Sequence, residues 1–210
     1  MDPYPNPPGK VDDIARLEAL YGHPSAPAIA KEADHLTPAY RAWVEASPFF
    51  ALGTVGPDGL DVSPRGDAGS CIFVRDERTL LLPDRRGNNR IDSLRNILAD
   101  PRVACMFLIP GVNEALRING LAAVSIDPGL CAELAREGQA PRSVVWISIR
   151  AVYFQCARSL LRSDLWAQGA LGRPAGVPTP GQMIADASLG REGGAAYDAA
   201  LADRQRKTLW

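Results

Sequence analysis

The clearest indication of the fold class is the stretch PFFALGTVGPDGLDVSPRG, residues 48–66. Two runs with the composition of β-strands flank a Pro-Asp-Gly turn at 57–59. This pattern predicts two antiparallel strands joined by a tight turn. Arg65 stands at the end of the second predicted strand beside Gly66, whose missing side chain would let a ligand approach the backbone closely.

Five further strand-like segments follow along the chain, at 71–76, 79–84, 102–109, 115–126 and 143–156. Helical segments interrupt them at 89–101 and near 128–137. The apolar face of the first helical segment comprises Ile91, Leu94, Ile97 and Leu98. Because neighbouring strands are joined mostly by turns, about six or seven strands favour an antiparallel barrel over a doubly wound parallel sheet.

Helices are predicted at both ends of the chain. Residues 12–22 have apolar positions at helical spacing, with Asp12 or Asp13 as the N-cap and Gly22 as the stop. A second helix begins after Thr37, which is a favourable N-cap residue. We divide the sequence into three parts, an N-terminal helical extension (1–36), a barrel domain (37–166) and a C-terminal helical and loop extension (167–210).

Composition limits the possible functions. The 210 residues are 46% hydrophobic and 22% charged, which is ordinary for a globular protein in solution. The formal net charge of -1 argues against a broad surface for nucleic acid or an anionic membrane. The longest apolar run, 103–112, is too short to span a bilayer, and the first residues lack the order of a secretory signal. We expect a cytoplasmic protein with neither nucleic acid nor membrane as partner.

The four cysteines, Cys71, Cys105, Cys131 and Cys156, are widely separated and form no C-x-x-C pair. We therefore expect mostly buried, reduced thiols and no metal centre. For Cys156 we favour an inert buried thiol over a redox-active one. The dinucleotide motif G-x-G-x-x-G, the P-loop motif and the metalloprotease motif H-E-x-x-H are absent from the sequence.

The stretch LLLPDRRGNNRIDSL, residues 80–94, places three arginines and two asparagines between a buried strand and a helix. A helix that starts near Asn89 would expose backbone N–H groups and a positive dipole end, which favour a phosphate. Arg90 would lie in its first turn, where a cation is disfavoured unless an anion is bound. Together with Arg65, these residues predict a phosphate clamp. In the alternative reading, Asn89 only caps the helix with Asp92, and the arginines are solvated.

Four segments carry a family resemblance, namely DVSPRGD (61–67), LLLPDRRGNNRIDSLRNIL (80–98), PRVACMFLIPGVNEALRINGLAAVS (101–125) and CARSLLRSDLW (156–166). In this order they resemble an FMN-dependent branch of the pyridoxamine 5'-phosphate oxidase-like flavoproteins. The resemblance implies a mainly β fold with flanking helices, specifically a six-stranded antiparallel split barrel. It also implies a homodimer that binds FMN at its interface and acts on a small-molecule substrate.

The resemblance further implies which residues hold the cofactor. They are Ser63, Arg65, Asn88, Asn89, Arg90, Ser93, Arg162, Ser163 and Trp166. The first six would bind the phosphate, with Arg85 and Arg86 as further candidates. The last three follow the last strand and would reach the flavin of the partner subunit, where an indole can stack on the ring. For Trp166, the alternative is an anchor in the core or the interface.

The chain departs from the true pyridoxamine phosphate oxidases in two places. It has Gly87, Asn88 and Asn89 where they carry a serine-arginine-lysine run, and it lacks their C-terminal arginine-leucine-histidine signature. We therefore expect an oxidoreductase that transfers a hydride at flavin N5 with a small molecule other than vitamin B6, and we assign no catalytic side chain. The alternatives are a flavin-binding module without turnover, or a split barrel that binds deazaflavin or haem.

Overall fold

The computed structural model describes residues 5–57, 59–169 and 172–207. The chain divides into two compact units, Met1–Glu32 and Ala33–Trp210. The division into three parts made from the sequence stays a prediction. Asp58, the middle residue of the predicted Pro-Asp-Gly turn, lies outside the described residues.

The described residues of the first unit form two short helices, α1 (Ile14–Tyr21) and α2 (Ala26–Ala30). The helix predicted within 12–22 is confirmed, because Asp13 Oδ1 accepts a hydrogen bond from the backbone N–H of Ala15 at 3.0 Å. Gly22 ends α1 with a φ of 73°. That left-handed conformation is the usual reason for a glycine at the end of a helix.

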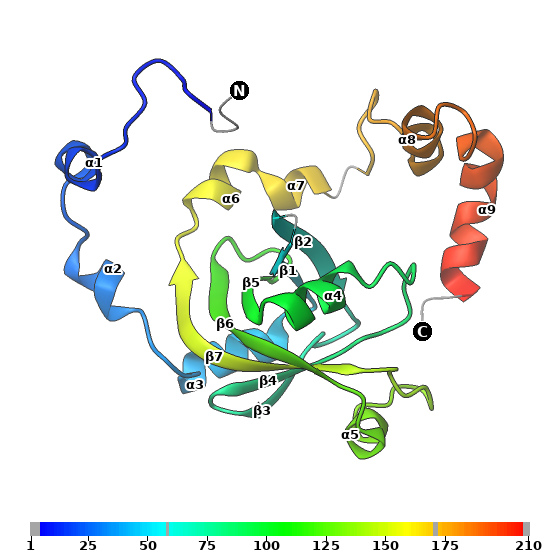
Figure 1. Cartoon of the computed structure of the whole chain (residues 1–210), viewed down its shortest axis with the longest axis horizontal. Helices are drawn as coiled ribbons and strands as arrows, with labels where there is room; N and C mark the ends of the chain where they lie inside the picture. Colours follow the sequence, from blue (N-terminus) through cyan, green and yellow to red (C-terminus); the bar gives the residue numbers. More distant parts are fainter. Residues whose placement is uncertain (1–4, 58, 170–171, 208–210) are drawn as a thin grey trace. The chain divides into compact units, whose positions relative to one another are not determined.

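The described part of the second unit contains seven strands (Figure 1), which are β1 (Phe49–Gly56), β2 (Gly59–Gly66), β3 (Phe73–Asp76), β4 (Thr79–Pro83), β5 (Arg102–Leu108), β6 (Ala115–Ser125) and β7 (Val144–Gln155). They form one antiparallel sheet in the order β2-β1-β5-β6-β7-β4-β3. The predicted mainly β, antiparallel architecture is confirmed.

The prediction of six strands was wrong by one. The short hairpin of β3 and β4 contributes two strands, and both pair into the same sheet. The sheet is open, with β2 at one end of the strand order and β3 at the other. The long strands β6 and β7 pair along almost their whole length, and a register shift between Asn119 and Gly120 interrupts their ladder.

One face of the sheet carries the hydrophobic core. The rings of Phe50 and Phe107 stack at 4.7 Å between centroids, and both side chains are fully buried. Burial of a side chain of this size contributes ~1.5–3 kcal/mol to folding. On the other face, Met106 is 44% and Trp146 is 37% exposed.

Three of the four cysteines are buried in this unit as predicted, and Cys156 is exposed, so the expectation that it is buried was wrong. Burial raises the pKa of the Cys71 thiol to about 12. Burial also raises the pKa of the Cys105 thiol to about 12. These two side chains are therefore neutral at physiological pH and act as packing groups.

The described helices of the second unit are α3 (Pro38–Ala46), α4 (Asp92–Ala99), α5 (Pro128–Glu133), α6 (Arg158–Ser163), α7 (Leu165–Gly169), α8 (Pro180–Ala187) and α9 (Gly194–Lys207). Helices α3 and α4 pack on the sheet, and α8 packs on α9. Thr37 caps α3 as predicted, since its Oγ1 accepts a hydrogen bond from the N–H of Tyr40 at 3.3 Å. No helix in the described ranges has the length and apolar character needed to cross a membrane.

Helix α4 packs on β1 and β2 and begins later than predicted (Figure 1). Its N-cap is Ile91 and its first residue is Asp92, so the predicted start near Asn89 was wrong. Asn89 and Ile91 both have left-handed backbones, with φ of 60° and 54°. The helix cannot propagate backwards through such residues, and Arg90 therefore precedes the helix instead of lying in its first turn.

The face that α4 turns to the sheet also differs in part from the prediction. Ile97 is buried as predicted, but Leu98 is 78% exposed. A polar contact fixes the helix, because Asn96 Nδ2 donates to the buried Thr54 Oγ1 at 3.0 Å. Gly56 leaves room for this contact, since a Cβ there would lie 2.2 Å from Asn96 Oδ1.

Candidate functional site

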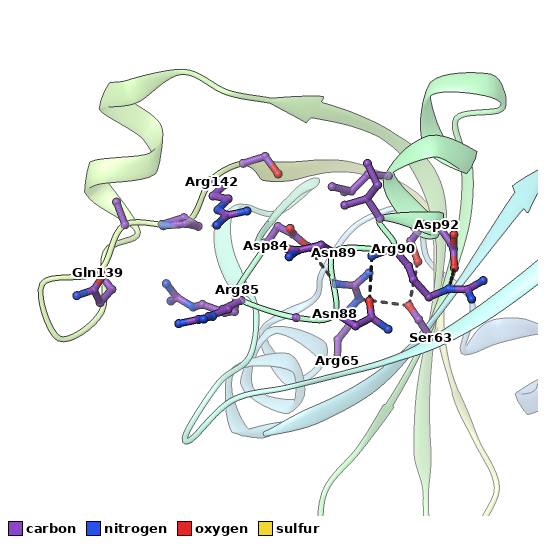
Figure 2. A pocket seen from close by; sticks show the side chains of 18 of the residues that line it. Ser63, Arg65, Asp84, Arg85, Asn88, Asn89, Arg90, Asp92, Gln139 and Arg142 are labelled. Carbon is purple, nitrogen blue, oxygen red and sulfur yellow. Dashed lines mark hydrogen bonds and ion pairs between the residues drawn. The ribbon is translucent and has the colours of Figure 1, made fainter. Parts of the chain in front are cut away.

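A polar pocket of about 490 Å³ lies where three parts of the second unit meet. Its walls are β2, the segment that joins β4 to α4, and the segment that joins α5 to β7 (Figure 2). Small-molecule sites commonly have volumes of ~300–1,000 Å³. Six of the nine residues named from the sequence line this pocket: Ser63, Arg65, Asn88, Asn89, Arg90 and Ser93.

At one end, β2 directs Ser63 and Arg65 into the pocket, because alternate residues of a strand point to the same face. Arg65 Nε donates to Ser63 Oγ at 3.3 Å, and its Nη1 donates to Asp84 Oδ1 at 3.2 Å. The hydroxyl of Ser63 lies 3.0 Å from that of Ser93 on α4. These contacts connect β2, the end of β4 and the start of α4. We refer to Ser63, Arg65 and Ser93 as the β2 end.

The guanidinium of Arg65 keeps donors that no described residue uses. Its side chain is 22% exposed, and only Nε and Nη1 donate hydrogen bonds within the described ranges. A guanidinium has five N–H donors in one plane. Nη2 is therefore available to an anion in the pocket.

Arg90 has a different environment from the one predicted. Its Nε donates to Asp92 Oδ2 at 2.7 Å, and its side chain is 73% exposed. This hydrogen bond to the Asp92 carboxylate raises the pKa of Arg90 above its ordinary value. The anion expected beside Arg90 is therefore supplied by the protein itself, and a role of Arg90 toward a phosphate stays a prediction.

The turn before α4 is shaped by Asn88 and Asn89. Asn88 Oδ1 accepts a hydrogen bond from the N–H of Arg90 at 3.1 Å, which makes a local turn through the side chain. Asn89 tolerates its left-handed backbone, whereas Ile91 is a β-branched residue for which this conformation is an outlier. Holding a residue in this conformation costs ~1–3 kcal/mol of folding free energy, and backbone strain of this kind occurs often at functional sites.

The opposite wall combines Arg85 and Arg86, which the sequence offered as further candidates, with two arginines that were not identified from the sequence. Its arginines come from the segment after β4 and from the segment between α5 and β7 (Figure 2). We refer to Arg85, Arg86, Arg136 and Arg142 as the arginine wall. Two arginines within the short stretch REGQAPR, residues 136–142, were the available signal. Only the pairing of β4 with β7 brings them beside Asp84, whose N–H donates to Ser143 O at 2.9 Å.

A nearly buried carboxylate holds two of these arginines in place. Asp67 is 5% exposed, and its Oδ1 accepts a hydrogen bond from Arg136 Nη1 at 2.6 Å. Arg85 Nε lies 3.5 Å from Asp67 Oδ2, an ion pair without hydrogen-bond geometry, so this buried Nε has no hydrogen bond to a described residue. Arg85 Nη1 donates to Leu134 O at 3.1 Å, which ties the wall to the end of α5.

The charges of the pocket do not balance. Six arginines and three aspartates line it, and Asp67 behind the wall is a fourth acid. The six positive and four negative charges leave an excess of two positive charges. This excess, together with the serine hydroxyls, fits a dianionic phosphate, which is bound by charge-assisted hydrogen bonds from guanidinium groups.

The remaining three residues named from the sequence lie outside the pocket of their own chain. Arg162 and Ser163 end α6, and Ser163 Oγ donates to Leu160 O at 3.1 Å. Trp166 on α7 is half-buried, and its Nε1 donates to Val112 O at 2.9 Å. A contact of these residues with the flavin of a partner subunit stays a prediction.

The described residues include no group of three or more His, Cys, Asp or Glu side chains placed to hold a metal ion. The described part of the pocket lining also includes no histidine, cysteine, methionine or tyrosine. The donor set of the site therefore consists of guanidinium, hydroxyl, amide and carboxylate groups, and oxyanions are the natural ligands of the first three.

Comparison with known proteins supports a specific family. A family model described as pyridoxamine 5'-phosphate oxidase matches residues 36–156. No curated protein matches the sequence.

Among solved structures, the chain is similar to a candidate pyridoxamine 5'-phosphate oxidase from Lactobacillus delbrueckii, with 22% identity, coverage of 58% of this chain and 95% of that chain, and a TM-score of 0.48. It is similar to HupZ from Group A Streptococcus, with 13% identity, coverage of 56% and 91%, and a TM-score of 0.47. It is also similar to the FAD binding protein from Mycobacterium smegmatis, with 14% identity, coverage of 59% and 97%, and a TM-score of 0.40.

Proposed function

The chain belongs to the pyridoxamine 5'-phosphate oxidase family, and from this premise we propose that it is a flavoprotein that binds FMN and acts as an oxidoreductase on a small molecule. The observation that carries the proposal is the β2 end of the pocket. There Ser63 lies 3.3 Å from Arg65 Nε and 3.0 Å from the hydroxyl of Ser93. We infer that this end receives the phosphate of FMN.

The chemistry of the β2 end supports a phosphate in particular. The hydroxyls of Ser63 and Ser93 can donate to phosphate oxygens, and Arg65 can donate through its available Nη2. Asp84 holds the guanidinium through Nη1 at 3.2 Å, so the side chain is oriented before the ligand arrives. A donor set that is already oriented loses less entropy on binding.

Asn88 and Asn89 would complete the phosphate site. Both line the pocket in the turn that leads into α4. Asp92 is the first residue of this helix, so the N-terminal N–H groups of α4 lie at the pocket wall. Free N–H groups and the dipole at a helix start favour an anion.

The flavin, when bound, would supply hydride transfer at its N5 atom. The residues of this chain would bind the phosphate and orient the ligand, and no described side chain at the pocket is assigned a proton-transfer role. The absence of the serine-arginine-lysine run and of the C-terminal signature supports a substrate other than vitamin B6.

We further propose that the active form is a homodimer with the flavin at its interface. Ile91, Leu94, Ala140 and Pro141 are the described pocket residues with apolar side chains, and none of them is aromatic, so no side chain of this lining can stack on a flavin ring. The face of β2 opposite the pocket exposes Leu60 by 84% and Val62 by 68%. Exposed apolar patches of this kind mark interaction sites, and a second copy would cover them and supply the remaining contacts to the ring.

The alternatives differ in what they require of the pocket. A haem protein needs an axial ligand such as histidine, cysteine, methionine or tyrosine, and the described pocket residues include none of these. A deazaflavin cofactor would use the same phosphate donors as FMN. A flavin-binding module without turnover would share the whole site with the enzyme, so only a reduction assay separates the two.

The test is a spectrum followed by a reduction assay. The full-length protein is purified, its absorbance is recorded, and FMN, FAD, deazaflavin and haem are each titrated into it. We expect flavin absorbance and binding of one FMN per chain, and then bleaching of the flavin by a nicotinamide donor. Tight binding of haem or deazaflavin without FMN binding would contradict the cofactor, and bound FMN that no donor reduces would favour the module without turnover.

A further inference from the structure

Helix α4, which forms one wall of the pocket, is held on the sheet partly by polar contacts. Its buried residues are Ser93 and Ile97, so its buried surface combines one hydroxyl with one aliphatic side chain. Within the described ranges, two side-chain hydrogen bonds join the helix to the sheet. One is the contact between Ser63 and Ser93 at 3.0 Å, and the other runs from Asn96 Nδ2 to Thr54 Oγ1 at 3.0 Å. The position of α4 therefore depends on these two contacts.

The contact between Asn96 and Thr54 lies in a site that is shaped for it. Thr54 is on β1 and is 1% exposed, and a hydroxyl buried to this degree needs a hydrogen-bond partner. Gly56 lies two residues further along β1, on the same face of the strand. A Cβ on Gly56 would overlap the Asn96 amide, so the glycine leaves the space that this amide occupies. Strand and helix are thus fitted to each other at this hydrogen bond.

The contact between Ser63 and Ser93 must change when a phosphate binds. In the proposed function, on which this inference rests, both hydroxyls donate to phosphate oxygens. Each hydroxyl carries one proton, so two serines that both donate to the ligand no longer donate to each other. Among the described residues, the hydrogen bond from Asn96 is then the remaining side-chain hydrogen bond between α4 and the sheet.

One helical turn separates this contact from the pocket. Asn96 follows Asp92, the first residue of α4, by four residues, which is ~6 Å along a helix. Asp92 and Ser93 are among the described residues that line the pocket, whereas Thr54 and Asn96 are not. Donor–acceptor distances of N–H···O hydrogen bonds span only ~0.5 Å. A shift of α4 by more than this amount would take Ser93 and the first N–H groups of the helix out of reach of a bound phosphate.

We propose that Asn96 and Thr54 are positioning residues for the phosphate of the cofactor. Their hydrogen bond holds the start of α4 at the pocket while Ser93 exchanges its contact with Ser63 for a phosphate oxygen. Neither side chain contacts the ligand, and the helix transmits their effect. The effect is confined to the phosphate, because the helix start contributes donors to that group and not to the flavin ring.

The experiment compares FMN with riboflavin, which has the same ring and no phosphate. Both are titrated by fluorescence into the full-length protein and into the variant Thr54→Val, which replaces the hydroxyl with a methyl group. We expect FMN affinity to fall ~3- to 10-fold, within the contribution of one hydrogen bond, and riboflavin affinity to stay within ~2-fold. Thr54→Ser keeps the hydroxyl and should keep FMN affinity within ~2-fold of the unsubstituted protein.

The matched control is Ile97→Val on the same helix. It removes one methylene from the buried face of α4 and leaves the contact of Asn96 in place. Both changes lower stability by comparable amounts, which melting temperatures check. Ile97→Val should keep the affinity for both ligands within ~2-fold. An equal fall in FMN affinity in Thr54→Val and Ile97→Val would overturn the inference, as would an equal fall in the affinities for FMN and riboflavin.

Gly56→Ala tests the same contact independently and serves in place of Thr54→Val if that variant does not fold. The added Cβ displaces the Asn96 amide, which is the end of a flexible side chain, so the strand and the helix themselves are retained. This variant should lower FMN affinity about as much as Thr54→Val and should also leave riboflavin affinity within ~2-fold. Unchanged FMN affinity in Gly56→Ala would contradict the positioning role.

Inorganic phosphate separates this inference from the proposed function. It is titrated by calorimetry into the same full-length proteins without flavin. If the protein binds no flavin but binds phosphate more weakly in Thr54→Val than in Ile97→Val, the proposed function fails alone. If FMN binds and the ratio of FMN affinity to riboflavin affinity is equal in all variants, the positioning role fails alone. If neither flavin nor phosphate binds, both fail.

Discussion

The two ends of the pocket hold their arginines in different ways. At the β2 end, Arg65 is oriented by Ser63 and Asp84, with one guanidinium nitrogen left available. At the arginine wall, Asp67 serves two arginines, while Arg86 and Arg142 have no partner among the described residues. The comparison shows that the net charge of a pocket and the orientation of its arginines depend on how the arginines are paired, and not only on how many there are. A paired arginine is oriented, and an unpaired one supplies net charge.

The largest expected effect is on the stability of the arginine wall. Asp67→Asn removes the carboxylate that Arg85 and Arg136 share. The loss is costly because the Asp67 side chain is only 5% exposed, so water cannot replace the lost charge. Loss of one partner in a buried pair costs ~3–5 kcal/mol, and the partial exposure of the arginines reduces this to about 2–4 kcal/mol. Denaturant unfolding of the full chain measures it. The control Asp61→Asn, at a pocket aspartate without an ion pair in the described ranges, should change stability by no more than ~0.5 kcal/mol. Equal stability of the two variants would show that Asp67 does not hold the wall.

The next largest effect, on FMN affinity, distinguishes the β2 end from the arginine wall. Arg65→Ala should weaken FMN binding by ~1.5–3 kcal/mol, the value of a charge-assisted hydrogen bond, which is roughly 10- to 150-fold in affinity. Arg142→Ala should leave FMN affinity nearly unchanged, since Arg142 lies at the other end. Fluorescence titration of FMN gives both values. Unchanged FMN affinity in Arg65→Ala would remove the phosphate from the β2 end.

A smaller effect concerns Trp166, the predicted contact to a partner's flavin. Replacing a fully buried tryptophan with alanine lowers the free energy of unfolding by ~3–5 kcal/mol. Trp166 is only half-buried and donates one hydrogen bond, to Val112 O at 2.9 Å. Trp166→Ala should therefore cost ~1–2 kcal/mol in stability. If the indole covers the flavin, the emission of bound FMN should also rise. A large fall in melting temperature with unaltered emission per bound flavin would instead identify Trp166 as a structural anchor.

The smallest effect is expected at Arg90. Its guanidinium is bound to Asp92 and is 73% exposed. Arg90→Ala should therefore reduce FMN affinity less than Arg65→Ala in the same titration. If the two variants lose equal affinity, Arg90 must leave Asp92 when the phosphate binds. In that case the strained turn at Asn89 and Ile91 would be a region that rearranges on binding.

The pair of Ser63 and Arg65 at the β2 end could be predicted because its geometry is local. Ser63 and Arg65 are two residues apart, and a strand directs such residues to one face. The start of α4 was predicted less accurately from the sequence. The periodicity of the segment favoured a start near Asn89, whereas the structure gives Ile91 a left-handed backbone that a β-branched residue rarely adopts.

The sequence by itself determined the strand segments and the polar residues of β2, because both depend on spacing within one segment. Only the tertiary structure decided which acids pair with Arg65 and Arg136. Arg65 meets Asp84 across 19 residues, and Arg136 meets Asp67 across 69 residues. Both pairs depend on how the sheet brings distant segments together. Coulomb energy depends on distance in space and not on distance along the chain, so these ion pairs follow from the segments that the fold brings together.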